Sequence, residues 1–373
     1  MMKDKNIHFL LYASCIPISG YKQTAIYDIN QEIVNILPNG LFNFIAKSKD
    51  TDVKTLKKKF QNKYDIEIDD LFNYLISKNI GFYTYTPQCF PKMSLLWETP
   101  HLVTNMVLDI SENSVIEYNI CNQIEESGCE ALQIRFLYNI EISNIKKIIH
   151  HFHNSRLRSI EIILLYNPAY GLKKYREVLH FDARIVSVCV CSSPFEKSTT
   201  YKRAQKTLIF SSNDIFGNNC GKISSYYFKI NTSLFTESHH YNTCLNRKLC
   251  IDADGNIKNC PAMQQNFGNI KDTTLQEAIE KNGFKDFWLI HKDKIDVCKD
   301  CEFRHMCTDC RCFIKDPENI YSQPAKCIYN PYICKWQGEE GYVPVEECGT
   351  YSKETGFVPD AVKIAELNKQ IWE

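Results

Sequence analysis

The cysteines are the residues of this chain whose type and spacing most clearly indicate chemistry. More than half of the eighteen cysteines lie in the region 244–334. Two short steps, Cys298-x-x-Cys301 and Cys307-x-x-Cys310, occur within it. Thiolates bind zinc and iron-sulfur clusters, and a CxxC step lets one turn of backbone present two sulfurs to the same group. The cysteines therefore indicate a metal-binding region.

Eight of these cysteines stand at spacings that indicate two metal-cluster sites. Structural zinc held by the same thiolates fits the spacing as well, so both interpretations stay open. Disulfides are the weaker interpretation, because disulfide scaffolds are short and this chain has 373 residues. We therefore expect a reducing, cytoplasmic location. The eight residues are Cys244, Cys250, Cys260, Cys298, Cys301, Cys307, Cys310 and Cys327.

Composition excludes two classes of partner. Lys plus Arg equals Asp plus Glu, so the formal net charge is zero and no general basic field would attract nucleic acid. No apolar stretch approaches the length of a membrane span. The run from Ile7 to Ala13 is too brief for a good signal sequence, and we expect a buried strand there. We expect neither nucleic acid nor a membrane as a partner.

Residues 1–88 carry the pattern of a small winged-helix domain. Strand-like segments occur at 9–13 and 24–27. A helical stripe of apolar residues follows, and it runs from Ile68 to Ile76 with helical spacing. The aromatic and β-branched run 80–85 then suits a strand or wing, and Pro87 begins a linker.

Residues 100–235 show a different pattern of apolar segments. Candidate strands recur at regular intervals, with helical stretches such as 145–152 between the early ones. Strand, helix and strand at this pitch predict right-handed βαβ units and a parallel sheet, which would form an open or partial barrel. The fold class is therefore α/β. The candidate strands are 102–109, 131–138, 159–166, 184–191 and 207–211.

The region 241–345 has few long periodic segments, and we expect its metals to organise it, because metal binding can supply folding energy that a thin core lacks. The tail 346–373 carries one predicted helix, from Ala361 to Ile371. These boundaries give an N-terminal winged-helix domain, a partial (β/α) barrel, a cysteine-rich domain and a tail.

The cysteine spacing resembles a known family. Cys250 and Cys260, with Gly255 between them, are followed by Cys298-Lys299-Asp300-Cys301 and then Cys307. This arrangement resembles the SPASM domain, an extension of radical SAM enzymes that modify ribosomally made peptides. The resemblance implies two auxiliary 4Fe-4S clusters. It also implies that Gly255 permits the tight turn of a hairpin between the first two cysteines.

The resemblance also assigns the ligands. It implies that the first cluster is bound by Cys244, Cys250, Cys260 and Cys310. It implies that the second is bound by Cys298, Cys301, Cys307 and Cys327. The family's last cysteine would stand one position after Cys310, so Cys310 and Cys312 both remain candidates for that ligand. The remaining Cys334 is expected to be an ordinary thiol.

The three-cysteine motif of radical SAM enzymes is absent. The loop after the first predicted barrel strand, Asp109 to Ser114, contains no cysteine. The nearest pair, Cys121 and Cys129, is expected on a helix and has no third partner. By resemblance, the middle region is a degenerate radical SAM barrel that does not bind S-adenosylmethionine.

Taken with the chain length, these features resemble the SPASM-domain peptide maturase of grasp-with-spasm systems. The resemblance implies a maturation factor for a ribosomally synthesised and modified peptide. Its partners would be the precursor or leader peptide, held by the winged helix, and an ATP-grasp ligase. Its own catalysis is left open, and we nominate no catalytic residue. The alternative is a redox enzyme that uses its clusters to modify a peptide.

Other candidate residues have simpler explanations. His239 and His240 are adjacent and, on a strand, would face opposite ways, so at most one would join a site. His150, His151 and His153 are expected near the C-terminal end of a helix, where its dipole favours them. Arg304 and Lys248 would balance the charge of the clustered thiolates.

Overall fold

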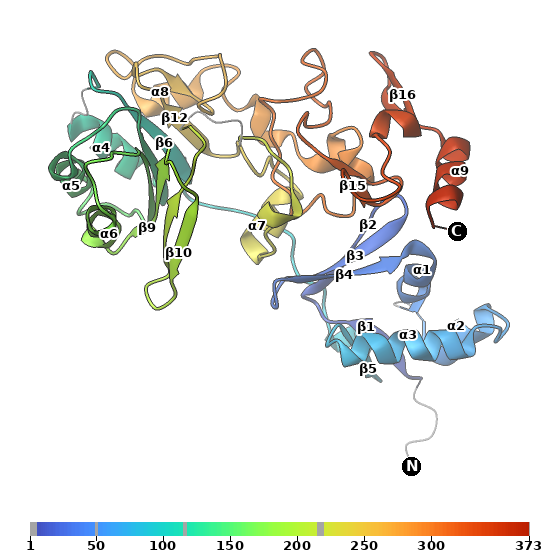
Figure 1. The fold of residues 1–373 in the computed structure, drawn as a ribbon. Helices are drawn as coiled ribbons and strands as arrows, with labels where there is room; N and C mark the ends of the chain where they lie inside the picture. Colours follow the sequence, from blue (N-terminus) through green and yellow to red (C-terminus); the bar gives the residue numbers. More distant parts are fainter. Residues whose placement is uncertain (1–5, 49–50, 115–117, 215–219, 373) are drawn as a thin grey trace. The chain divides into compact units, whose positions relative to one another are not determined.

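The computed structural model describes residues 6–48, 51–114, 118–214 and 220–372 (Figure 1). The chain forms two compact units. The first contains residues 1–97, 221–243 and 290–373, and the second contains residues 98–220 and 244–289. The cysteine-rich region predicted at 241–345 is thus divided between the units, because its first hairpin adds to the sheet of the second unit.

The N-terminal part of the first unit contains two antiparallel sheets and three α-helices. Three strands form a meander in the order β2-β3-β4, and β1 pairs with β5. The predicted strands around Phe9, Thr24 and Phe82 are confirmed. The elements are β1 (His8–Leu11), β2 (Cys15–Ser19), β3 (Gln23–Asp28), β4 (Ile33–Pro38), α1 (Asn39–Ser48), α2 (Val53–Lys59), α3 (Asp65–Ser77), β5 (Gly81–Thr84) and the short η1 (Pro87–Cys89).

The apolar stripe of α3 forms the core of this part. Ile68, Leu71, Phe72 and Leu75 are buried, as their helical spacing predicted. Phe72 stacks on Phe9 of β1 with ring centroids 4.0 Å apart. Full burial of such side chains contributes about 1.5–3 kcal/mol each. The stripe of α3 is therefore occupied by the domain's own core.

The C-terminal part of the first unit is built from short elements, as its lack of periodic segments predicted. Its longest helix, α9, confirms the helix expected in the tail. The elements are η2 (Ser225–Tyr227), α7 (Thr232–Ser238), η4 (Lys292–Lys294), η5 (Cys298–Asp300), β14 (Tyr329–Asn330), β15 (Lys335–Trp336), η6 (Val345–Cys348), β16 (Gly349–Ser352), β17 (Gly356–Pro359) and α9 (Ala361–Trp372).

A buried glutamate joins these two parts of the first unit. Glu302 is fully buried, and its carboxylate accepts hydrogen bonds from Gln23 Nε2 and Tyr329 Oη, both at 2.5 Å. Tyr27 Oη donates to the Glu302 backbone carbonyl at 2.7 Å. Gly20 lies so close that a Cβ there would stand 2.6 Å from Glu302 Oε2. The meander therefore holds the backbone of the cysteine-rich segment in place.

The second unit contains one eight-stranded sheet in the order β10-β11-β9-β8-β7-β6-β12-β13. Its six central strands, β11 to β12, run parallel, whereas β10 and β13 are antiparallel. The predicted parallel sheet is confirmed. The strands are β6 (Asn105–Ile110), β7 (Ala131–Phe136), β8 (Ser159–Leu165), β9 (Ile185–Cys191), β10 (Lys197–Tyr201), β11 (Lys206–Phe210), β12 (Lys248–Ile251) and β13 (Ile257–Lys258).

Helices cover one face of this sheet. Figure 1 shows α4 (Tyr118–Glu126), α5 (Ile142–His151) and α6 (Leu172–Phe181) side by side on that face. Ile145 and Ile149 of α5 and Val178 of α6 are buried in the same core as the strands. A hairpin through β10, rather than a helix, connects β9 to β11. The remaining helices are α8 (Leu275–Glu280), which begins with a Thr274–Glu277 capping box, and η3 (Asp286–Leu289).

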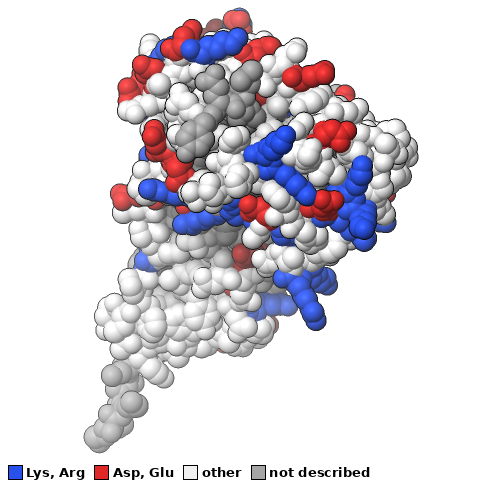
Figure 2. Space-filling model, turned by 90° about the vertical axis from the view of Figure 1, so that its left-hand side faces the viewer, with Lys and Arg blue, Asp and Glu red and all other residues white. Residues whose placement is uncertain are grey.

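The surface is mixed in charge. Basic and acidic side chains are interspersed on the face drawn in Figure 2, in keeping with the formal net charge of zero. Among the described residues, none of the helices combines the length and apolar character that a membrane crossing requires.

Candidate metal centres

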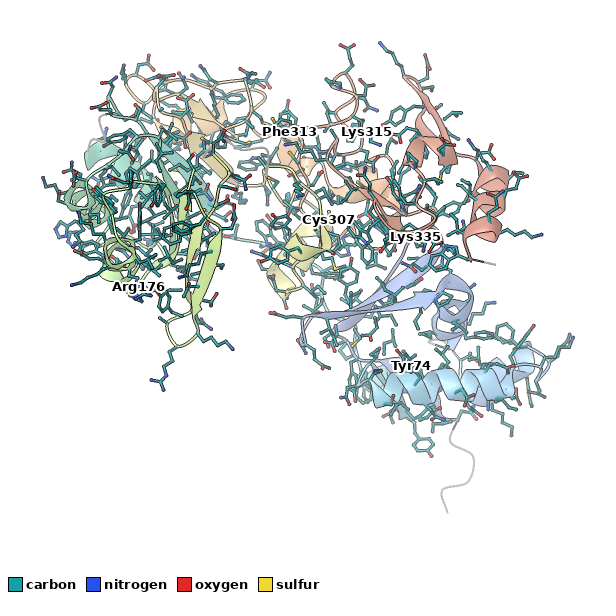
Figure 3. The ribbon with its side chains drawn as sticks, in the orientation of Figure 1. Tyr74, Arg176, Cys307, Phe313, Lys315 and Lys335 are labelled. Atoms are coloured by element: carbon teal, nitrogen blue, oxygen red, sulfur yellow. The ribbon has the colours of Figure 1, made fainter. Side chains whose placement is uncertain are left out.

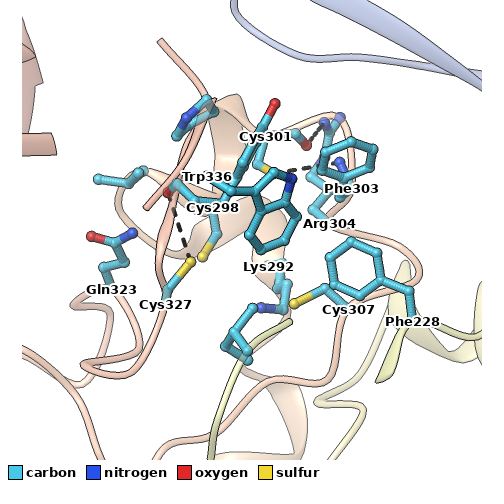
Figure 4. Close-up of a pocket in the computed structure, with 14 residues that line it drawn as sticks. Phe228, Lys292, Cys298, Cys301, Phe303, Arg304, Cys307, Gln323, Cys327 and Trp336 are labelled. Atoms are coloured by element: carbon cyan, nitrogen blue, oxygen red, sulfur yellow. Dashed lines mark hydrogen bonds between the residues drawn. The ribbon is translucent and has the colours of Figure 1, made fainter. Parts of the chain in front are cut away.

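Four cysteines line one pocket of the first unit (Figure 4). Cys298 lies in η5, Cys301 directly follows η5, Cys307 lies further along the same segment (Figure 3), and Cys327 precedes β14. These are the four residues assigned to the second cluster from the sequence. The structure brings them together in one place, and their role as ligands stays a prediction.

The backbone around Cys298 is arranged to present two thiols from one turn. The Cys301 amide donates to the Cys298 carbonyl at 3.0 Å. Val297, just before the turn, has a φ of 66°, which is an unfavourable region for a β-branched residue. Arg304 Nη1 donates to the Cys301 carbonyl at 2.9 Å. Strain of about 1–3 kcal/mol persists only where the surroundings enforce it, and it is concentrated at functional sites.

Burial governs the protonation of these thiols. It raises the pKa of Cys298 to about 11 and also raises the pKa of Cys301, Cys307 and Cys327. A buried thiolate is costly unless a positive charge or a metal compensates it. The pocket would therefore release protons as its sulfurs bind iron, which couples metal binding to folding. In this way the donor set fits a thiolate-bound cluster.

Two cationic side chains, Lys292 and Arg304, line this pocket. Lys292 of η4 is 4% exposed and lines the pocket with the four cysteines (Figure 4). Burial alone would lower its pKa, yet the net pKa is raised because the thiolates of Cys307 and Cys298 and the carboxylate of Asp309 stabilise the ammonium. Lys292 also acts against the burial that raises the pKa of the Cys307 thiol. It therefore offsets part of the negative charge of the thiolates.

Lys292→Met is expected to weaken this centre. The change removes the buried ammonium that offsets the negative charge of the thiolates. We expect faster loss of iron to a chelator and a more negative reduction potential, because both depend on the charge and hydrogen bonds at the sulfurs. The matched control is Lys299→Met, since Lys299 is partly exposed and bonds Asp296 at 3.5 Å outside the pocket. Equal behaviour of the two variants would show that Lys292 has no special role.

Aromatic side chains form the outer wall of the pocket. Phe228, Phe303, Tyr329 and Trp336 line it together. The ring centroids of Tyr329 and Trp336 are 4.7 Å apart, and those of Phe303 and Tyr329 are 5.1 Å apart. Such a wall limits the access of water to the sulfurs, and solvent exposure is one of the factors that set the potential of a cluster.

A buried ion pair fixes the segment that follows Cys307. Asp309 and Arg311 are bonded at 2.6 Å, and both side chains are 1% exposed. Arg311 Nη1 also donates to the Ser322 carbonyl at 2.8 Å, and Asn242 Nδ2 donates to Asp309 at 2.7 Å. Cys310 lies between the paired residues and is buried.

Cys310 packs against a glycine of the first unit. Gly221 has a φ of 76°, and a Cβ there would stand 2.9 Å from Cys310 Sγ. A side chain at this position would clash with the sulfur and strain the backbone. The alternative candidate, Cys312, is only partly buried.

The other predicted thiol set is built on the sheet of the second unit. Cys250 lies in β12, which pairs in parallel with β6 so that Cys250 is opposite Val107. Cys244 precedes β12, and Cys260 follows β13. The fourth predicted member, Cys310, belongs to the first unit. Its association with the other three therefore stays a prediction.

The hairpin between Cys250 and Cys260 has the expected glycine turn. Gly255 has a φ of 84°, and a Cβ there would stand 3.0 Å from Ile270 Cγ1. The Gly255 amide donates to the Asp252 carbonyl at 2.9 Å. Both the left-handed backbone and the close approach favour glycine.

The loop after β6 is a serine turn. The Ser111 amide donates to Ser114 Oγ at 2.9 Å, and Ser114 Oγ donates to the Ala253 carbonyl at 2.9 Å. Asp109, at the end of β6, forms two 2.6 Å hydrogen bonds with Arg135 of β7. The side chains at the end of β6 and in the loop after it therefore form hydrogen bonds within the protein.

The two cysteines nearest to that loop in sequence are buried in the core. Cys121 lies on α4 as predicted, but the prediction for Cys129 was wrong, because α4 ends at Glu126 and Cys129 follows the turn at Gly128. Burial raises the pKa of Cys121 to about 11 and that of Cys129 to about 12. Both are packing thiols rather than reactive ones.

The histidines also differ in part from the sequence prediction. His239 and His240 do not lie on a strand; they follow the C-terminal end of α7. His239 stacks on His305 with ring centroids 3.8 Å apart, and His240 Nε2 is 3.0 Å from the Leu95 carbonyl oxygen. His150 and His151 lie in the last turn of α5, as expected for residues favoured by the helix dipole.

Sequence reasoning missed Lys292 and Glu302, since a single charged residue in a non-periodic segment carries no signal of burial.

Within the described ranges, no three His, Cys, Asp or Glu side chains are placed to share a single metal ion.

Comparison with known proteins bears directly on the cysteine-rich segment. Residues 243–302 match the SPASM family, described as an iron-sulfur cluster-binding domain. The match includes Cys244, Cys250, Cys260, Cys298 and Cys301. It ends before the other three predicted ligands.

No curated protein matches the chain. Among solved structures, the crystal structure of Streptococcus suis SuiB bound to precursor peptide SuiA is similar, with 11% identity and a TM-score of 0.33. The similarity covers 86% of this chain and 98% of that one. A similarity at this level does not indicate a shared function.

Proposed function

We propose that this protein is a maturation factor for a ribosomally synthesised and modified peptide. In this proposal it binds two 4Fe-4S clusters and a precursor or leader peptide, acts beside an ATP-grasp ligase, and performs no radical SAM chemistry. The observation that carries the proposal is the pocket lined by Cys298, Cys301, Cys307 and Cys327, which adjoins a segment that matches an iron-sulfur domain. The peptide-modification pathway and the ATP-grasp partner in this proposal come from the sequence resemblance to grasp-with-spasm maturases.

In this proposal the residues that line the pocket would hold the second cluster. The four sulfurs would bind iron, Lys292 would offset their charge, and the aromatic wall would limit water. A bound cluster would supply structural support or electron transfer. Zinc remains the alternative occupant of the same thiolates.

The absence of radical SAM chemistry is supported by the loop after β6. A cluster that binds S-adenosylmethionine would need three thiolates there, whereas Ser111 and Ser114 form a turn and Asp109 is paired with Arg135. Formation of 5'-deoxyadenosine from S-adenosylmethionine by the reduced, cluster-loaded protein would contradict this part of the proposal.

The N-terminal residues offer a site for the peptide. We keep the winged-helix assignment of residues 1–88 as part of the proposal, although the apolar stripe of α3 is occupied by the domain's own core. A cavity of about 520 Å³ lies against α1. Five consecutive residues from Phe9 to Ala13 line it, so the backbone of β1 forms one wall. Phe42 of α1 and Phe90 of the following segment add apolar surface.

This arrangement suits an extended peptide. Strand addition along β1 would provide backbone hydrogen bonds, and the apolar cavity would accept side chains that fix the register. Tyr12, Phe82 and Phe90 extend the apolar surface, with ring centroids 4.9 and 4.8 Å apart between successive members.

The binding experiment uses the full chain and the small peptides encoded beside its gene, labelled with a fluorophore. We expect one of them to bind with a micromolar-scale Kd, roughly 8 kcal/mol. Phe90→Ala should weaken it about tenfold, because Phe90 lines the cavity and is 49% exposed. Leu96→Ala is the control, since Leu96 is 75% exposed and does not line the cavity.

Two results would count against the peptide site. One is equal loss of affinity in both variants. The other is the absence of binding to every neighbouring peptide, which would favour the redox-enzyme alternative, in which the clusters contact the substrate. Removal of residues 1–88 is not a clean test, because it would take Gln23 and Tyr27 away from the buried Glu302.

A further inference from the structure

Two cysteines outside both predicted thiol sets lie next to each other on the sheet of the second unit. Cys189 and Cys191 belong to β9, and their Sγ atoms are 4.0 Å apart, in hydrogen-bond contact. Val188 and Val190, which alternate with them, are buried in the core that the helices share with the sheet. Because side chains along a strand point to alternate faces, the two thiols share the face of the sheet opposite the helices.

The two thiols differ in exposure. Cys191 is 6% exposed, whereas Cys189 is only partly buried. Cys189 stands between Ile163 of β8 and Ile209 of β11, which are its partners in the two neighbouring strands. Both isoleucines are themselves partly buried. A reagent would therefore reach Cys189 first, and the branched side chains on either side would admit only a small one.

The contact between the thiols makes one of them more acidic. A hydrogen bond from Cys191 lowers the pKa of Cys189, although burial and the carboxylates of Glu161 and Glu196 oppose this shift. The same hydrogen bond, together with burial, raises the pKa of Cys191. Because the thiolate is the nucleophilic form of cysteine, Cys189 is the thiol that would attack first.

The pair suits thiol–disulfide exchange better than metal binding. Among the residues that the structure describes, no third His, Cys, Asp or Glu completes a metal-binding group around it. Alternate residues of a strand are about 6.4–6.8 Å apart, which is the upper end of the range of about 4.4–6.8 Å between Cα atoms that a disulfide joins. A disulfide between these residues would be strained, and strained disulfides are readily reduced and serve catalysis or regulation.

We infer that Cys189 and Cys191 form a dithiol site that reduces a low-molecular-weight disulfide. The Cys189 thiolate attacks one sulfur of the substrate, the substrate S–S bond breaks, and a mixed disulfide forms as the first thiol leaves. Cys191 then attacks the Cys189 sulfur, which closes the protein disulfide and releases the second thiol. The two protons of the protein thiols end on the two released thiols, and two electrons pass from the cysteines to the substrate. The inference does not depend on the proposed clusters.

The test treats the reduced full chain with oxidised glutathione under anaerobic conditions, blocks the remaining thiols with N-ethylmaleimide and digests the protein with trypsin. Both cysteines fall in one tryptic peptide, residues 185–197, because cleavage follows Arg184 and Lys197. By mass spectrometry we expect this peptide to have lost two hydrogens and to have escaped alkylation. Cys89 is the control, since it is exposed and its tryptic peptide contains no second cysteine, so it should carry glutathione instead.

Single variants separate the two roles. In Cys191→Ser the mixed disulfide should persist, so that Cys189 carries glutathione. In Cys189→Ser the Cys191 thiol should stay reduced, because it is buried. Free thiols at both positions of the wild type, while Cys89 carries glutathione, would overturn the inference, and so would a mixed disulfide that never closes. Equal glutathione on the remaining cysteine of the two variants would refute the order of attack and with it the site.

Discussion

Cys301→Ser is expected to remove one cluster and to destabilise the first unit. Cys301 lines the pocket with three other cysteines and directly precedes Glu302, whose carboxylate and backbone hold the N-terminal meander. Because metal binding and folding are coupled in such regions, a lost ligand should affect both. Iron should fall from about eight to about four atoms per chain, as expected for two 4Fe-4S clusters.

The measurements are iron and sulfide content after anaerobic reconstitution and the midpoint of urea unfolding. Cys334→Ser is the control, because Cys334 is a partly buried cysteine that does not line the pocket. We expect it to keep the wild-type iron content. Undiminished iron in Cys301→Ser would remove this residue from the ligand set, and zinc with negligible iron in the wild type would favour the zinc alternative.

Arg311→Met is expected to have the largest effect on stability among changes outside the thiols. Its side chain and that of Asp309 are each 1% exposed, so the variant leaves a buried carboxylate without its ion-pair partner. Loss of one partner from a buried pair typically costs about 3–5 kcal/mol. The backbone carbonyls of Ile320 and Ser322 would also lose a donor. We expect a large fall in the free energy of unfolding and poorer retention of iron.

An exposed ion pair provides the comparison. Arg156 is 72% exposed and lies 3.4 Å from Glu125, so Arg156→Met should cost less than about 1 kcal/mol. Urea unfolding monitored by circular dichroism measures both variants. Similar midpoints would show that the buried pair contributes little to the net stability of the segment.

Local patterns in the sequence determined the elements and the identity of the thiols. The helical spacing from Ile68 to Leu75 predicted the buried face of α3, because an apolar stripe can be removed from water only by packing. The regular recurrence of apolar runs predicted the parallel strands. The short step from Cys298 to Cys301 predicted two thiols on one turn. Each signal depends on neighbours that are close in sequence.

Tertiary structure decided how distant segments meet. Tyr27 and Glu302 are 275 positions apart, yet they form a 2.7 Å hydrogen bond that secures the cysteine-rich segment. The burial of Lys292 among thiols likewise depends on the path of the whole chain. No local periodicity encodes these contacts, because burial of a single charged or sulfur-containing side chain depends on which remote segments pack around it. The sequence therefore identified cysteine thiolates as the expected ligands, whereas the fold decided which charges and thiols surround each site.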